Sequence, residues 1–409
     1  MRLMNFGDGT IYSAEEIART RNAIFILFAA NGFAFASWMS RLPDIKDTLH
    51  LTPGEQGVML LAISAGSLIG LPLAGRIVSA IGARRAIRAA AFVVIPGFIL
   101  ALAAVALGDS HYLVMPGLLL FGLGTGLWDV AQNLVGAVVE QASRKSIMSW
   151  FHAAFSGGTV AGALVGAGVV ALGVPMYLHL GAMALLLGGV AVVCPAMISL
   201  RLDGRGVSDE SNGEDVRPVT SARSAWTEPR TLLIGVMVLA GSFAEGTAND
   251  WMAIAFVDGH GVTNAMGVVA LAVFLAFMTA GRIFGTQMLD RYGRVVVLQA
   301  LFGAAIVGSL LVVFGNVTLA FIGAAIWGVG ASLAFPVGMS AAADDPQRAA
   351  LRISVVSTVG YGAFLSGPPL LGFLGDHVGI LHALLFVTAT AVVAAIVAPA
   401  AKPLEGAKY

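Results

Sequence analysis

The sequence predicts an all-α membrane protein with twelve transmembrane helices, arranged as two pseudo-symmetric bundles of six. Three observations predict this fold: an unusually apolar composition, twelve apolar segments of spanning length, and short patterns that recur half a chain apart. Hydrophobic residues make up 58% of the 409 residues and charged residues only 11%, with a mean hydropathy of +0.87. Soluble domains carry about 25% charged residues, so this composition indicates a chain that lies in a bilayer.

The apolar segments match the hydrocarbon core of a bilayer, which takes about 20 residues to span. The predicted spans are 22–41, 54–79, 86–107, 112–139, 147–172, 175–198, 231–257, 265–289, 295–314, 317–341, 352–374 and 380–401. Residues 1–21 are polar and lack the apolar core of a secretory signal, which predicts a cytoplasmic tail. The polar break 199–230 predicts a flexible cytoplasmic linker between bundles over 22–198 and 231–401. Residues 402–409 form a second predicted tail.

The basic residues predict the orientation. Nineteen of the 23 lysines and arginines fall in alternate loops and in the two tails, all on one predicted side. Arg41 and Lys46 lie on the other side, and Arg76 and Arg282 lie inside spans. The positive-inside rule therefore places both termini in the cytoplasm, and we expect the bacterial inner membrane.

Composition and motifs exclude several function classes. With 23 basic and 23 acidic residues there is no electrostatic case for a nucleic-acid partner. The single cysteine, Cys194, excludes a disulfide or a cysteine metal cluster within one chain. The sequence has no phosphate-binding loop, HExxH or GxSxG motif, so we expect no cofactor, no metal and no enzymatic activity.

The two halves share short patterns in the same order. Asn31-Gly32 before Trp38 recurs as Glu245-Gly246 before Trp251, Gly82 with Arg84-Arg85 as Gly293 with Arg294, Gly122-x-Gly124 as Gly328-x-Gly330, and the stretch from His152 as that from Tyr361. The offsets run from 206 to 214 residues, close to half the chain. Each match is weak alone, but four in one order indicate an internal duplication.

Two loops resemble the motif G-x-x-x-D-R-x-G-R-R of the major facilitator superfamily, whose members are transporters with two parallel repeats. The second copy keeps Asp290, Arg291, Gly293 and Arg294 but has Thr286 at the first glycine. The first copy keeps Gly75, Gly82, Arg84 and Arg85 but has Ser79 at the aspartate. In that family the aspartate helps to latch the outward-facing state, so the resemblance implies a cytoplasmic gating motif at these residues.

Four further stretches narrow the resemblance. They are NGFAFASWMSRLPDIKDTL (31–49), LWDVAQN (127–133), FHAAFSGGTVAG (151–162) and EGTANDW (245–251). Together they resemble the YbjJ-type branch of the superfamily, near the fucose-permease group. The superfamily resemblance covers nearly the whole chain, whereas the branch rests on these four stretches.

The strongest single candidate for function is Glu245, in the stretch from Gly241 to Met252. It lies about 14 residues into its span, roughly 21 Å along a helix, and hence near the midplane. A charge at the bilayer centre costs roughly 2.5–3.5 kcal/mol, so such a residue usually faces a cavity or a partner. Asn249 lies four residues further and shares its face, whereas Asp250 points elsewhere.

Asp129 is the second candidate, about 17 residues into the fourth predicted span. Asn133 follows one turn later on the same helical face, and Gly122 and Gly124 allow this helix to approach a neighbour closely. One interpretation is a polar link to a neighbouring helix. The other is a carboxylate that binds a proton or a substrate.

Other polar and aromatic residues inside spans are weaker candidates. Asn31 is the repeat counterpart of Glu245, and His152 and Tyr361 are counterparts of each other. Trp38 and Trp251 could stack on a substrate, although tryptophans near an interface more often act as belt anchors. Arg282 could pair with Asp129 or Glu245, but its position slightly favours a side chain that reaches the cytoplasmic interface.

Together, these features predict a secondary active transporter that moves a small solute by alternating access. Glu245 and Asp129 are the predicted proton or substrate sites, and a proton gradient is the expected energy source, with Na⁺ left open. The fucose-permease resemblance favours a sugar or sugar acid, with drug or metabolite efflux as the alternative. A transport-inactive receptor or scaffold is the alternative of another class. We expect a monomer whose partners are a small-molecule substrate, protons and the lipid bilayer.

Overall fold

The computed structural model describes residues 3–5, 11–108, 110–143, 147–199, 222–342, 344–345 and 348–404. These residues are almost entirely helical. Contacts divide the chain into two compact units: unit 1 is Met1–His50 with Met59–Asp215, and unit 2 is Leu51–Val58 with Val216–Tyr409. Within the described residues, eleven helical segments are long and apolar enough to cross a membrane. The predicted span 352–374 is not among the eleven, but it lies in α14 (Ala349–Val378), a helix of 30 residues.

Unit 1 begins with two short strands and continues as helices. The strands are β1 (Leu3–Asn5) and β2 (Ile11–Ser13), and they pair antiparallel with Leu3 opposite Ser13. The helices are α1 (Ala14–Met39), α2 (Leu42–Leu49), α3 (Pro53–Ile81), α4 (Ala83–Leu107), α5 (His111–Ser143), α6 (Met148–Ala171) and α7 (Met176–Met197). The first residues of α3 group with unit 2.

Unit 2 consists of α-helices with short irregular turns. Its elements are η2 (Ala222–Thr227), α9 (Pro229–Ile254), η3 (Ala255–Gly259, a π-helical turn), α10 (Asn264–Tyr292), α11 (Arg294–Phe314), α12 (Val317–Ala331), α13 (Ala334–Ala342), α14, α15 (Ile380–Ala383), α16 (Leu385–Val397) and η4 (Ala398–Ala401). The pair α12 and α13 occupies one predicted span, and α15, α16 and η4 occupy another.

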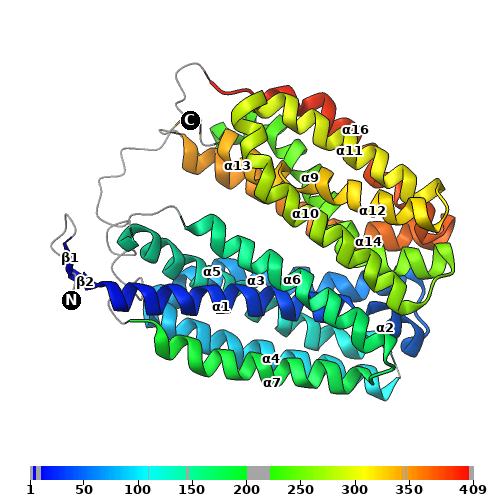
Figure 1. Ribbon diagram of the computed structural model, residues 1–409, viewed down its shortest axis with the longest axis horizontal. Coiled ribbons are helices and arrows are strands. Elements are labelled where there is room, and N and C mark those ends of the chain that lie inside the picture. The colour runs from blue at the N-terminus through cyan, green and yellow to red at the C-terminus, as the bar shows by residue number, and fades with distance from the viewer. Residues whose placement is uncertain are drawn as a thin grey trace. The chain divides into compact units, whose positions relative to one another are not determined.

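The helices pair in the same pattern in both units. In unit 1, α1 packs against α6 and α7, and α4 packs against α5 and α7 (Figure 1). In unit 2, α9 packs against α14 and α16, and α11 packs against α12 and α16. These helices correspond in chain order, so the duplication in the sequence has a counterpart in the packing.

The α1–α6 contact is close because three glycines bring the two backbones together. A Cβ atom at Gly32 would overlap the carbonyl oxygen of Phe155, and one at Gly158 would overlap the carbonyl oxygen of Ala29. A Cβ at Gly162 would lie 2.6 Å from the carbonyl oxygen of Phe33. Gly158 and Gly162 form a small-xxx-small spacing, which lets membrane helices pack by direct van der Waals contact.

The two loops that resemble the gating motif turn on single glycines. Gly82 alone separates α3 from α4, with φ 81° and ψ 154°. Gly293 alone separates α10 from α11, with φ 79° and ψ 161°. This backbone region is accessible essentially only to glycine. The matching glycines in the two motif copies therefore make the same turn in each unit.

The first helix begins earlier than the first predicted span. Ser13 caps α1 by accepting a hydrogen bond from the Glu16 amide, and the Glu16 carboxylate accepts one from the Ser13 amide. This capping box satisfies two otherwise unpaired amides at the helix start. Residues from Ala14 onward, which the sequence places in a tail, are therefore helical. Within the predicted linker, 200–221 lie outside the described residues.

Candidate functional site

An ion pair lies inside the membrane-spanning helices of unit 2. Glu245 on α9 and Arg282 on α10 meet through Oε2 and Nη2 at 2.7 Å. Their side chains are 20% and 30% exposed, respectively. The prediction that Arg282 reaches the interface is wrong, because this contact holds its guanidinium at Glu245. The pairing is the alternative that the sequence left open.

A break in a neighbouring helix supplies the second partner of Arg282. Its Nε donates to the carbonyl oxygen of Ser332 at 3.2 Å, between the end of α12 and the start of α13. Pro336 is four residues after Ser332 and has no amide hydrogen, so it cannot form the helical bond to that carbonyl. The freed carbonyl is available to Arg282. The Ser332–Pro336 spacing is the sequence signal for this contact.

The other candidates in unit 2 differ in how far they are buried. Asn249 lies one turn after Glu245 and is half-buried. Asp250, the next residue, is also half-buried. Tyr361 on α14 is 38% exposed, and its ring lies 6.0 Å from that of Phe335, measured between centroids. Trp251 is 0% exposed, so it neither anchors the protein at an interface nor has a face open to a solute.

In unit 1, Asp129 is held by two amides of its own helix. Its Oδ1 accepts hydrogen bonds from Gln132 Nε2 at 3.2 Å and from Asn133 Nδ2 at 3.0 Å. Asn133 thus shares the face of Asp129, as their spacing predicts. His152 on α6 is exposed and interacts electrostatically with Asp129. The hydrogen-bond donors to Asp129 are thus neutral amides, whereas the donor to Glu245 in unit 2 is a guanidinium.

Asn31 lines a pocket inside unit 1. The pocket is small, with a volume of about 10 Å³, and its polar lining comes from Asn31 on α1 and from Thr125 and Trp128 on α5. Trp128 is 2% exposed, and its Nε1 has no hydrogen-bond partner among the residues that the structure describes. Thr125 and Trp128 are polar groups at a pocket that the sequence does not single out. Trp38 does not line it; its side chain is 0% exposed and packs edge-on against Phe98.

The predicted gating residues are distributed over both units. In unit 1, Arg84 is half-buried and Arg85 is exposed at the start of α4. In unit 2, Asp290 is exposed, and the guanidinium of Arg291 lies 5.3 Å from the ring centre of Tyr292. For Gly75 and Ser79 the structure describes only the backbone, which is helical.

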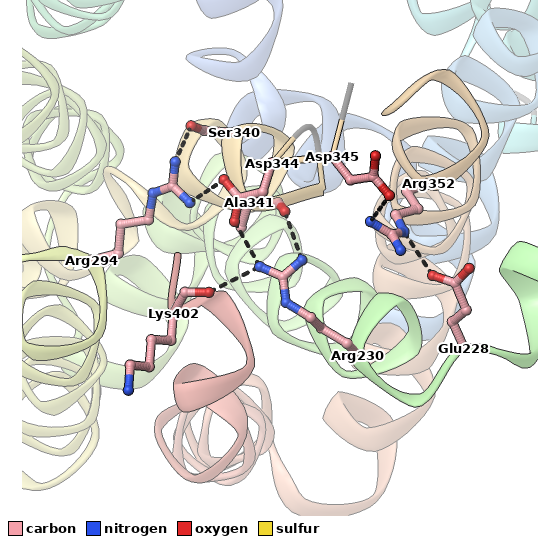
Figure 2. Close-up of polar contacts among 9 residues, drawn as sticks. All are labelled: Glu228, Arg230, Arg294, Ser340, Ala341, Asp344, Asp345, Arg352 and Lys402. Atoms are coloured by element: carbon pink, nitrogen blue, oxygen red, sulfur yellow. Dashed lines mark hydrogen bonds and ion pairs between the residues drawn. The ribbon is translucent and has the colours of Figure 1, made fainter. Parts of the chain in front are cut away.

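Arg294, the last gating residue, belongs to an ionic network at one end of unit 2. Figure 2 shows Arg230 and Arg294 reaching Asp344 from two sides, each at 2.7 Å from one carboxylate oxygen. Arg294 also donates to Ser340 Oγ at 2.8 Å, and Arg230 to the Lys402 carbonyl at 3.0 Å. The network joins the starts of α9 and α11 to the end of α13 and to the chain after η4.

Glu228 forms a second part of this network, next to the start of α9. Its Oε2 accepts from Arg352 Nε at 2.7 Å and from Thr231 Oγ1 at 2.9 Å, and its Oε1 lies 2.6 Å from Arg348 Nη2. Burial alone would raise the pKa of Glu228. The hydrogen bonds from Arg352 and Thr231, with the charges of Arg352 and Arg348, outweigh burial and lower this pKa below its ordinary value of 4.5.

Glu228→Gln is expected to lower the free energy of unfolding by about 1–2 kcal/mol at neutral pH. Because the pKa is lower in the folded protein, the carboxylate stabilises the fold fully above about pH 4.5, and this contribution is lost as pH falls through the folded pKa. Thermal unfolding in detergent between pH 3 and pH 7 measures the effect. The difference between wild type and variant should shrink on acidification. Glu15→Gln, at an exposed glutamate of α1, is the control, and parallel curves for Glu228→Gln and wild type would contradict the prediction.

Two repeated helical units with ionic groups inside their spans define the class: a multi-pass membrane protein built by duplication. A family model described as Major Facilitator Superfamily matches residues 24–348 and 269–408, and the chain belongs to this superfamily. It is therefore a transporter and not an enzyme. The superfamily resemblance of the loop motifs is confirmed, while the branch stays a prediction.

Known proteins agree with this assignment. An uncharacterized transporter, y4wD, of Sinorhizobium fredii is 31% identical over 379 residues, covering 92% of this chain and 96% of that protein. The membrane protein MosC of Rhizobium meliloti is 28% identical, covering 92% and 88%. Among solved structures, the nucleoside transporter NupG aligns with a TM-score of 0.69 at 15% identity, covering 93% and 98%. The transporter FucP aligns with a TM-score of 0.61 at 18% identity, covering 94% and 100%.

Proposed function

We propose that the protein is a proton-coupled secondary transporter that moves a small polar solute across the bacterial inner membrane by alternating access. The observation that carries this proposal is a carboxylate held inside the spans of each unit, Glu245 by Arg282 and Asp129 by Gln132 and Asn133. An ionised carboxylate at this depth in the bilayer costs free energy, so such residues usually pair with another group or lie on a substrate or ion pathway. We further propose that the protein is a monomer and that both its termini lie in the cytoplasm; the distribution of basic residues supports the location of the termini.

A sugar or sugar acid is the favoured solute. Two proteins with a similar fold support this preference, a fucose:proton symporter and a D-xylose-proton symporter, with TM-scores of 0.60 and 0.70. Their identities of 18% and 13% limit the similarity to the fold. The solute preference therefore rests on this analogy and on the four stretches that resemble the fucose-permease neighbourhood, and the coupling rests on the carboxylates.

The test is proton movement in proteoliposomes that contain a pH dye and are challenged with sugars, sugar acids, amino acids and cationic drugs. With wild type, one solute class should move protons, and Glu245→Gln or Asp129→Asn should reduce that signal to background. Glu15→Gln and Asp47→Asn make the same chemical changes at exposed positions and should behave as wild type. Solute flux without proton flux that survives both substitutions would contradict coupling. Proton-coupled flux of the drugs alone would favour efflux, and no flux at all would favour a receptor.

A further inference from the structure

Arg282 is a cation well inside α10 whose hydrogen-bonding capacity is only partly used. Its Nη2 donates to Glu245 and its Nε to the Ser332 carbonyl. Its Nη1 has no hydrogen-bond partner among the residues described, and the side chain is 30% exposed. A guanidinium presents five donors in a planar fork that matches a carboxylate. Arg282 can therefore accept a second oxyanion ligand beside Glu245.

Charge balance links this capacity to the proton. With Glu245 ionised, the two side chains are neutral as a pair. When Glu245 takes up a proton, Arg282 is left as an uncompensated cation inside the spans, which is costly. An arriving carboxylate would restore neutrality. Protonation of Glu245 and binding of an anion at Arg282 should therefore favour each other, as linked equilibria require.

Among the described residues of α9, α10, α12, α13 and α14, Asp250 is the one charged group besides this pair that lies away from the helix ends. On α9, Asp250 follows Glu245 by five residues and so points to a different face, and Arg230 lies in the first turn. Asp258 lies beyond the end of α9, in η3. On α10, Asp290 and Arg291 lie in the last turn. The sequence from Val317 to Ala342, which forms α12 and α13, has no titratable residue, and on α14 Tyr361 is the titratable residue away from the ends. Glu245 is thus the group that balances Arg282 in this structure.

We propose that Arg282 binds the carboxylate of an anionic solute, of the sugar-acid type, while the displaced Glu245 carries the proton that accompanies it. This inference rests on the proposed function and names its substrate class. Asn249, one turn after Glu245 on the same face, is placed to hydrogen-bond a hydroxyl of such a solute. The neutral sugar lacks the ligand for Arg282 and should bind poorly.

The experiment compares matched pairs that differ in the carboxylate: glucuronate with glucose, and galacturonate with galactose. Calorimetry on the purified full-length protein in nanodiscs measures affinity between pH 5 and pH 8. At least one acid should bind about 30-fold or more tightly than its neutral partner, with proton uptake on binding. Equal affinity for acid and neutral sugar, or no saturable binding of either acid, would overturn the inference.

Two variants separate a binding role from a structural one. Glu245→Gln should keep or strengthen binding of the acid and abolish its pH dependence, because the amide mimics the protonated carboxyl. The double variant Glu245→Gln/Arg282→Gln removes both charges, leaves no unpaired ion, and should weaken acid binding about 30-fold or more relative to Glu245→Gln. Glu15→Gln/Arg19→Gln makes the same pair of changes at exposed positions on α1 and should have no effect. A folded double variant that binds the acid as tightly as Glu245→Gln would overturn the inference.

The same solutes in proteoliposomes keep the two proposals apart. Proton movement with a neutral sugar and none with its acid would overturn the carboxylate inference and leave proton-coupled transport standing. Uptake of the acid without proton movement would overturn the coupling but leave Arg282 as the carboxylate site. Proton-coupled uptake of the acid alone supports both proposals.

Discussion

Asp344→Asn is expected to destabilise the protein by about 3 kcal/mol. The Asp344 side chain is 3% exposed, and its two oxygens compensate Arg230 and Arg294, which are 25% and 11% exposed. Removing one member of a buried ionic group leaves its partners uncompensated, which costs more than the lost contact itself. Equilibrium unfolding in mixed micelles, followed by helical circular dichroism, measures the change.

The adjacent residue provides the control. Asp345 is 31% exposed and lies 3.3 Å from Arg352 Nη1, so Asp345→Asn should cost no more than about 1 kcal/mol. High salt should weaken the Asp345 contact more than those of Asp344, because buried pairs are screened less. Similar losses for both variants would show that the network acts through general surface charge and not through the buried carboxylate.

The features that the sequence predicts best are those set by residues close together in the chain. Apolar runs of spanning length predict the membrane helices, and the motif glycines Gly82 and Gly293 stand at one-residue turns with almost the same backbone angles. The amide of Asn133 reaches Asp129 because four residues are about one helical turn. In each case the physical cause acts within one or two turns.

The features that the sequence does not predict depend on packing between distant segments. Arg282 and Glu245 are 37 residues apart in the sequence. The packing of α9 against α10 brings the Arg282 guanidinium to Glu245 and not to the cytoplasmic membrane interface. Arg41 also makes a contact that depends on packing between distant segments. Its side chain is buried, at 2% exposed, and its Nε donates to Nδ1 of His179, 138 residues away in the sequence, at 3.1 Å. Trp38 has an amphipathic side chain that suits an interface, yet it is buried because α1 presents it to Phe98 on α4.

Gly158→Ala is expected to destabilise unit 1 by about 3 kcal/mol, although alanine is the better helix former. Its Cβ would overlap the carbonyl oxygen of Ala29, a backbone atom that cannot rotate away, so α1 and α6 would have to separate. Overpacking of this kind outweighs the gain of about 0.5–1 kcal/mol that alanine brings to a helix. Unfolding in mixed micelles measures this change as well.

Gly157→Ala is the matched control, because it makes the same substitution one residue earlier on α6. Nothing lies within 4 Å of a Cβ at Gly157, so this variant should be neutral or stabilised by up to about 1 kcal/mol. Gly32→Ala should destabilise the protein about as much as Gly158→Ala, because its Cβ would overlap the Phe155 carbonyl in the same α1–α6 contact. Gly32 also follows Asn31 in the chain, so separating α1 from α6 should disturb the pocket that Asn31 lines. Equal stability of the Gly157 and Gly158 variants would mean that α1 and α6 can separate without loss of free energy. The close α1–α6 contact would then not stabilise unit 1.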